Sequence, residues 1–158
     1  MANVDAPNGF QPEYLMGGGG AIPLMSVLLS SNTGCKIGDP IALLTTGLAT
    51  VGSATSTEIL GVAQETVTAV AATRKNVKVA VALENAVFSG QCSGNCAITR
   101  IGEDVDIEGS TGIFEINEDA SSIDIARIIG LKPVSGNAWG TNARVLFVWQ
   151  KSAFSGRD

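Results

Sequence analysis

Few side chains in this sequence could support catalysis, because its 158 residues include no histidine. Catalysis by a nucleophile paired with a histidine base is therefore excluded, as are most metal-assisted hydrolyses. Paired carboxylates remain possible, since Asp104, Asp106 and Glu108 alternate along one short stretch. Alternating acids usually form a solvated strand face, and nothing beside them indicates the burial that raises a carboxyl pKa for acid catalysis. We predict that the protein is not an enzyme and has no catalytic residues.

Two further motifs bear on cofactor or metal chemistry. The stretch CSGNC could close a disulfide loop between Cys92 and Cys96 or supply two metal thiolates, but a structural zinc site needs four ligands. We expect free thiols at Cys35, Cys92 and Cys96, with the Cys92–Cys96 disulfide as the alternative. Glycines 17–20 lack both the preceding strand and the continuation of a phosphate loop, and they indicate a flexible joint. No cofactor and no metal is expected.

Composition and charge limit the partners. The 10 basic and 15 acidic residues give a formal charge of −5, and no basic run is longer than Arg74-Lys75, so neither nucleic acid nor a membrane is an expected partner. The longest apolar run, residues 22–29, is far short of the roughly 20 residues of a membrane span. No secretory signal is visible, which indicates synthesis in a cytoplasm. The 45% hydrophobic and 16% charged content suits a subunit packed against others.

Alternation of apolar and polar residues predicts short β-strands. The period of two is clearest in VKVAVAL and EDVDIEG, and it recurs in IFEIN, EILGVAQE, AVFS and CAITRI. Gly, Ser, Asn and Pro separate these segments. In SSIDIARIIGLKP a strand is preferred over a helix because isoleucine is β-branched. The expected fold is all-β, a compact small barrel or sandwich of short antiparallel strands.

The two ends of the chain carry the remaining apolar signals. ARVLFVWQ is apolar on both faces, so it is either a core strand or part of an interface with a neighbouring subunit. Residues 1–16 carry apolar side chains and two prolines without a periodic pattern, and glycines follow them. We predict an extended N-terminal arm and glycine hinge over residues 1–20, ordered on a partner, followed by a single all-β body over residues 21–158.

Several stretches, taken in order, resemble one family. They are MANVDAPNGFQP, EILGVAQE, DVDIEGSTGIFEIN, IARIIGLKPVSGN and GTNARVLFVWQKSAF. Together they are similar to the head decoration (capsid cement) proteins of tailed bacteriophages, over most of the chain except residues 66–101. The resemblance implies a non-enzymatic homotrimer in the virion, on the outer surface of the capsid. There it would clamp neighbouring major capsid proteins and stabilise the shell.

Contact residues are predicted from expected exposure, not from the family. For the arm against the major capsid protein they are Phe10, Pro12, Tyr14 and Leu15; for contacts between subunits or with the shell they are Phe147, Trp149 and Phe154. The alternative function is a phage tail or fibre-associated module that binds carbohydrate or a host surface. That function favours clustered exposed aromatic residues, and a chain with one tyrosine and two tryptophans gives a poor signal for it.

Overall fold

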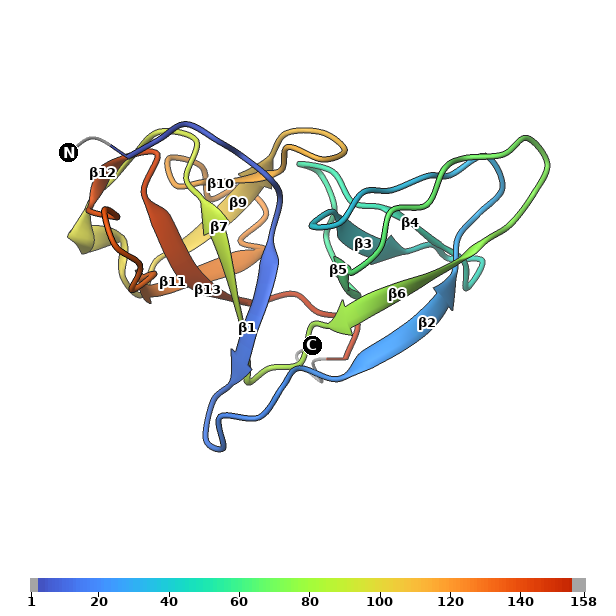
Figure 1. The fold of residues 1–158 in the computed structure, drawn as a ribbon, viewed down its shortest axis with the longest axis horizontal. Helices are drawn as coiled ribbons and strands as arrows, with labels where there is room; N and C mark the ends of the chain where they lie inside the picture. Colours follow the sequence, from blue (N-terminus) through green and yellow to red (C-terminus); the bar gives the residue numbers. More distant parts are fainter. Residues whose placement is uncertain (1–2, 155–158) are drawn as a thin grey trace.

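The structure, a computed structural model, describes residues 3–154, and these residues are almost entirely β-strand and turn (Figure 1). A single turn of 3-10 helix, η1 (Ile98–Arg100), is the helical element in this range. The predicted all-β class is confirmed. Within the same range, no helix has the length and apolar character that a membrane crossing requires.

The strands form two large antiparallel sheets, each in its own lobe, and one two-stranded sheet (Figure 1). The large lobe holds a six-stranded sheet in the order β1 (Gln11–Leu15), β7 (Ala86–Gln91), β13 (Arg144–Trp149), β11 (Ala126–Leu131), β9 (Asp104–Glu108) and β10 (Glu115–Asn117). The small lobe holds five strands in the order β2 (Leu24–Leu28), β6 (Asn76–Val81), β5 (Gly61–Ala63), β3 (Pro40–Leu43) and β4 (Ala49–Val51). A short pair, β8 (Asn95–Cys96) and β12 (Gly140–Thr141), extends the large lobe.

The chain crosses between the lobes three times. It leaves β1 for β2 to β6, returns for β7 to β13, and then brings residues 151–153 back beside Ile59 of the small lobe. The Ile59 N–H donates to the Lys151 carbonyl (2.9 Å), and the Ala153 N–H donates to the Ile59 carbonyl (3.0 Å). The two lobes are therefore bound together at both ends of the chain.

Both faces of the small-lobe sheet contribute side chains to a core. Val77 and Val79 of β6 point into a core inside the small lobe. On the opposite face, Val62 and Ala80 join the larger core, which continues into the large lobe. The alternation of VKVAVAL predicted this strand correctly, but its alanine face is covered rather than solvated. Small side chains let the second sheet approach closely, which produces a sandwich of packed sheets.

Other predicted strands are confirmed with local differences. The SSIDIARIIGLKP segment supplies β11, whose register shifts between Ile128 and Gly130 as at a bulge. The strand expected in CAITRI is wrong, because residues 98–100 form η1 and leave Ile98 exposed. On β9, Asp106 is buried instead of facing solvent with its neighbours.

The extended N-terminal arm is also wrong for the residues described. Asn3 donates through its amide nitrogen to the carbonyls of Ala138 (2.8 Å) and Thr141 (2.9 Å), and β1 pairs antiparallel with β7. Phe10 is 1% exposed. The prolines and glycine do keep this segment extended, but burying an aromatic ring in its own core is more favourable than leaving it in water for a partner. Residues 1 and 2 of the expected arm lie outside the described range.

A close approach of two glycines brings Phe10 to the core. Gly9 and Gly38 both have positive φ (75° and 93°), and a Cβ on Gly9 would lie 2.5 Å from the Gly38 carbonyl oxygen. That oxygen accepts a hydrogen bond from the Phe10 N–H (2.8 Å). Only glycine combines this conformation with this spacing, so the Asn8-Gly9 turn fixes where the N-terminal segment meets the small lobe.

The glycines that were expected to be a hinge form the turn between β1 and β2. The Gly19 N–H donates to the Leu15 carbonyl, and the Leu15 N–H donates to the Gly20 carbonyl (both 3.0 Å). The turn is exposed, and it connects the two lobes instead of releasing an arm from them.

Replacing Phe10 tests whether the N-terminal segment belongs to the fold. We expect Phe10→Ala to lower the free energy of unfolding by about 3–5 kcal/mol, because it leaves a cavity in the larger core. The exposed Val4 is a matched control in the same segment, and Val4→Ala should change stability by less than about 0.5 kcal/mol. Denaturant titration followed by circular dichroism measures both. Equal stability of the Phe10 variant and the parent would mean that the segment is dispensable for folding.

Candidate binding surface

Three of the predicted contact residues are buried inside the protein. Phe10, Phe147 and Trp149 are each no more than 2% exposed. Their rings meet edge to face, with centroids 5.3 Å apart for Phe10 and Phe147, 5.4 Å for Phe10 and Trp149, and 5.0 Å for Phe147 and Trp149. The prediction that they contact a partner is corrected, because these aromatic rings fill the larger core. The core-strand interpretation of ARVLFVWQ therefore holds for the face that carries Phe147 and Trp149.

The other predicted contacts lie at or near the surface. Tyr14 is 38% exposed and Phe154 is 45% exposed. Pro12 is half-buried within β1, and Leu15 is half-buried against the larger core. Tyr14 and Phe154 are thus the two predicted contacts with the most accessible side chains.

These two aromatic residues are anchored to the same short segment between β6 and β7. Tyr14 pairs with Val87 in the sheet, and the following Met16 N–H donates to the Asn85 carbonyl (2.8 Å). Ser152, two residues before Phe154, donates from its hydroxyl to the Ala82 carbonyl. All three anchor points fall within residues 82–87. We define Tyr14, Met16 and Phe154 as the junction patch, three exposed apolar residues whose segments are anchored to residues 82–87, between β6 and the start of β7.

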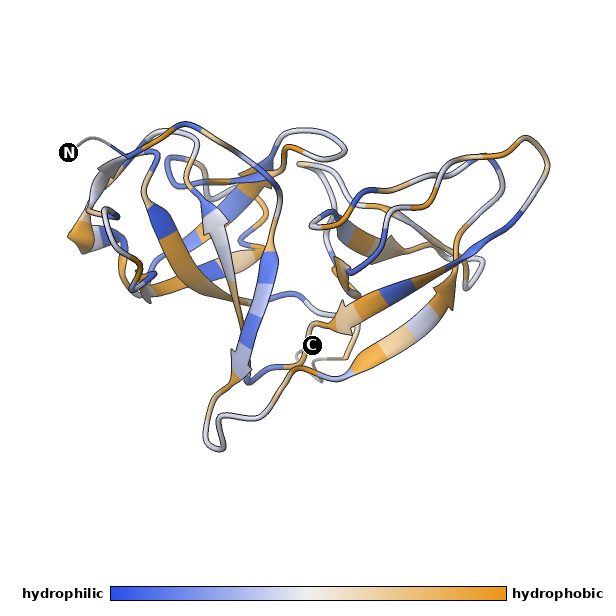
Figure 2. Cartoon of the chain, in the orientation of Figure 1, coloured by the Kyte–Doolittle hydropathy of each residue, from blue (hydrophilic) through white to orange (hydrophobic). Residues whose placement is uncertain are grey.

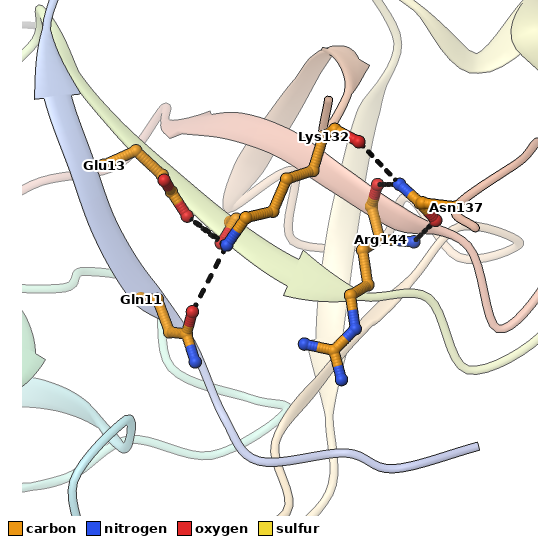
Figure 3. Close-up of polar contacts among 6 residues, drawn as sticks. Gln11, Glu13, Lys132, Asn137 and Arg144 are labelled. Carbon is orange, nitrogen blue, oxygen red and sulfur yellow. Dashed lines mark hydrogen bonds and ion pairs between the residues drawn. The ribbon is translucent and has the colours of Figure 1, made fainter. Parts of the chain in front are cut away.

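A polar network holds β1, the strand that carries Tyr14, in place (Figure 3). The Lys132 ammonium lies 2.6 Å from a Glu13 carboxylate oxygen, and it also donates to the Ser89 hydroxyl (3.1 Å) and the Gln11 side-chain oxygen (3.3 Å). Ser89 donates to the same Glu13 oxygen at 2.5 Å. The Lys132 and Glu13 side chains are only 16% and 23% exposed, so solvent screens their attraction less than it does for a surface pair.

Hydrogen bonds from the Asn137 side chain hold the loop that follows Lys132 in place. Asn137 donates from its amide to the carbonyls of Lys132 and Arg144 (both 2.8 Å), and its oxygen accepts the Arg144 N–H (2.9 Å; Figure 3). The Arg144 guanidinium reaches the Ala6 carbonyl (3.3 Å). The loop that follows Lys132 and the N-terminal segment therefore stabilise each other.

The acids that were considered for catalysis each have a structural partner. Asp104 forms a two-point ion pair with Arg127, both contacts being 2.8 Å. The buried Asp106 accepts three backbone N–H groups of residues 122–124 (2.9 Å each), and Glu108 accepts the Asn117 amide (2.8 Å). Bonded in this way, the three carboxylates fix loops and strands and do not converge on a common point.

Glu118 differs from these acids. It is 2% exposed, and neither carboxylate oxygen has a hydrogen-bond partner within the structure. It lines a surface cavity together with Arg100 and Asp119, which are joined by an ion pair of 2.6 Å. Across residues 3–154, no three His, Cys, Asp or Glu side chains are grouped as a metal site would require.

All three cysteines are free and buried. A hydrogen bond to Cys96, together with burial, raises the pKa of the Cys92 thiol. Burial raises the pKa of Cys35 to about 11 from 9.0. Because the thiolate is the reactive form, the environments of Cys35 and Cys92 do not favour a nucleophilic cysteine. The hydrogen bond with Cys92 lowers the pKa of Cys96, whose side chain is nevertheless buried.

A buried aspartate connects the lobes on the side of the Gly9–Gly38 contact. Asp39 accepts the Lys36 N–H (2.8 Å) within its own loop and the Gly112 N–H (2.6 Å) from the large lobe. Burial raises the pKa of Asp39, and these two hydrogen bonds partly offset that shift. The sequence does not predict this role for Asp39, because Gly38-Asp39-Pro40 indicates only a turn.

Comparison with known proteins does not assign this surface. No protein-family model matches the sequence, and no curated protein is significantly similar to it. The resemblance to capsid decoration proteins accordingly stays a prediction from the motifs.

The Glu13–Lys132 pair should contribute more to stability than an exposed pair. In a double-mutant cycle with Glu13→Ala and Lys132→Ala, we expect a coupling of about 1–2 kcal/mol from denaturant titration, because the pair is half-buried and shares Ser89. The matched cycle uses Arg100 and Glu103, whose side chains are 31% and 49% exposed, and should give at most about 1 kcal/mol. A Glu13–Lys132 coupling no larger than this control would contradict the assignment.

Cys35 should be unreactive in the native protein. A pKa of about 11 in place of 9.0 lowers the thiolate fraction of Cys35 at pH 8 about a hundredfold, and burial limits access further. We expect an aromatic disulfide reagent to modify native Cys35 at least about a hundred times more slowly than in guanidinium, where three thiols should titrate. Between pH 9 and pH 11 the unfolded chain ionises this thiol first, so stability should fall as pH rises. Immediate reaction of the native protein would disprove the burial.

Proposed function

We propose that this protein is a structural capsid decoration (cement) protein. In this role it binds the outer surface of an icosahedral phage head, bridges neighbouring major capsid proteins and stabilises the shell. The junction patch is the observation that carries the proposal, because Tyr14, Met16 and Phe154 expose apolar side chains on segments that are anchored to the connection between the two lobes. A cement protein needs only such complementary surface, repeated over many copies.

The geometry around the patch supports a binding role. Tyr14 stands on β1, which Lys132 and Glu13 hold in place, so contact with a shell would require little ordering of the chain. Aromatic residues that are rigid before binding commonly contribute the largest share of interface energy. The homotrimer that the motif resemblance implies belongs to this proposal, since three linked copies would raise overall binding by roughly 10² to 10⁴.

The alternative is a phage tail or fibre-associated module that binds carbohydrate or a host surface. Sugar binding by stacking favours several aromatic rings on one face. Among residues 3–154, Tyr14 and Phe154 are the most exposed aromatic side chains, whereas Trp149 is buried. The observed exposure therefore gives this alternative less support than the capsid role.

Binding to heads that lack the protein tests the proposal. The parent protein should bind purified heads to saturation and raise the temperature at which they release DNA. The double variant Tyr14→Ser/Phe154→Ser should need at least about tenfold more protein for half-occupancy, because it removes two aromatic contacts. The matched control Ile98→Ser/Val134→Ser changes two exposed apolar residues of the large lobe and should bind like the parent.

Cryo-electron microscopy of the mixtures locates the protein on the particle. Density on the shell supports the capsid role, and density at the tail tip supports the alternative. Equal binding by the two double variants would remove the junction patch from the proposal, and no association with particles would overturn the function itself.

A further inference from the structure

A half-buried arginine of the large lobe lacks an acidic partner. Three other basic residues of this lobe, Arg100, Arg127 and Lys132, each form an ion pair. Within residues 3–154, the Arg144 guanidinium forms no ion pair, and its one hydrogen bond is the contact of 3.3 Å with the Ala6 carbonyl. A guanidinium carries five N–H donors. Most of the Arg144 donors are therefore available to a further partner.

The fold holds Arg144 at the surface end of a core strand. Arg144 begins β13, which starts hydrophilic and continues through apolar residues (Figure 2). Asn137 is bonded to the Arg144 backbone, and the guanidinium extends away from Asn137 (Figure 3). Asp5, the residue before Ala6, is bonded to the Gln91 side-chain amide instead (2.9 Å). The Arg144 charge is thus positioned by the fold but not neutralised within it.

Arg144 lines a surface cavity of about 220 Å³. The other lining residues are Asn3 and Val4 of the N-terminal segment, residues 134–137 of the loop that follows Lys132, and Asn142. None of these residues is acidic. Arg144 is consequently the only charged residue of the lining, and it gives the cavity a positive charge.

Several polar groups of the lining residues have no hydrogen-bond partner within residues 3–154. They are the Ser135 hydroxyl, the Asn142 side-chain amide, and the backbone N–H groups of Ser135 and Gly136. All of them can donate a hydrogen bond, as can the guanidinium, whereas an ionised carboxylate offers only acceptors. The lining therefore matches an anionic acceptor.

We propose that this cavity binds a carboxylate carried on a small apolar group, with the Arg144 guanidinium as its ion-pair partner. The inference goes beyond the capsid role and does not depend on it. Pockets for drug-sized ligands measure roughly 300–1,000 Å³, so the smaller volume here suits a single amino-acid residue. Val4, which is 75% exposed, supplies an apolar side chain beside the charge. The ligand is thus the end of a polypeptide or an acidic side chain.

Charge nearby favours a carboxylate over a phosphate. Gln91 pairs with Arg144 in the sheet, and its side-chain amide donates to the carboxylates of Asp5 and Glu115 (2.9 Å each). These two acids repel an anion, and they repel a phosphate, with a charge of about −1.5 to −2, more than a carboxylate of charge −1. A carboxylate also matches the planar fork of the guanidinium, which can donate two parallel hydrogen bonds to it.

The site is ordered before any ligand binds. Asn3 is bonded to the carbonyls of Ala138 and Thr141, and Asn137 is bonded to Lys132 and Arg144, so both walls of the cavity are held in place. Binding then costs little loss of chain freedom. For a ligand of about ten non-hydrogen atoms, we expect a dissociation constant of about 1–10 mM.

A matched pair of small probes tests the site. N-acetylvaline carries a carboxylate on an apolar group, and N-acetylvalinamide is the same molecule without the charge. In titrations of the isotope-labelled full chain followed by NMR, N-acetylvaline should shift the Gly136 N–H and the Arg144 side-chain N–H to saturation. The amide should bind at least about fivefold more weakly, because it cannot form the ion pair. The α-amide of N-acetylglutamate presents a side-chain carboxylate, and the tighter of the two acids distinguishes a chain end from an acidic side chain.

Variants at Arg144 decide the proposal. Arg144→Gln should weaken N-acetylvaline binding at least about fivefold, and Arg144→Lys should weaken it less, because it keeps the charge but loses the fork. Arg127→Gln is the matched control, since Arg127 is paired with Asp104 on the neighbouring strand and does not line the cavity; it should bind like the parent.

Three results would overturn the inference. They are equal binding of the acid and the amide, unchanged binding by Arg144→Gln, and shifts of the same resonances by inorganic phosphate but not by N-acetylvaline. Unchanged resonances away from the cavity confirm that each variant is folded. Because the titration uses no phage heads, its result is independent of the capsid role.

Discussion

The packing of Phe10 between the lobes is the interaction on which the rest of the structure depends. Its ring lies against Phe147 and Trp149 of β13, while its N–H is bonded to Gly38 of the small lobe. The next residue, Asp39, accepts a hydrogen bond from Gly112 of the large lobe. One short loop is therefore bonded both to the N-terminal segment and to the β9–β10 connection, and this fixes the two sheets relative to each other.

This constraint changes how the protein can bind. A flexible arm would lose conformational freedom on meeting a partner, and that loss would subtract from the binding free energy. With β1 already paired to β7 and its Glu13 bonded to Lys132, Tyr14 is positioned before any partner arrives. Under the proposed capsid role, binding through the junction patch would use residues that are already in place. Its strength would depend on shape and on the number of copies, and folding of an arm would contribute nothing.

The sequence predicted what is local and failed where contacts are distant. Period-two alternation identifies β6 and β9 because side-chain direction alternates within one strand. It cannot tell that Phe10 is buried while Tyr14 is exposed, since that depends on the β7 pairing and the irregularity after Pro12. Asp106 was placed in solvent because the three N–H groups that satisfy it come from a loop sixteen or more residues away. The junction patch depends on residues 82–87, which no motif marks.

The apolar composition also needs a different explanation from the one it first suggests. Much apolar content with little charge indicates surface reserved for neighbours, yet the small-lobe sheet contributes to a core on each side, with Val79 on one side and Ala80 on the other. Most of these apolar side chains are buried in the core that the two sheets share. Exposed apolar side chains remain at the lobe junction and on β2, and also in loops, at Ile98 and Val134 among others. The case for partners therefore rests on where the exposed side chains lie, more than on how many there are.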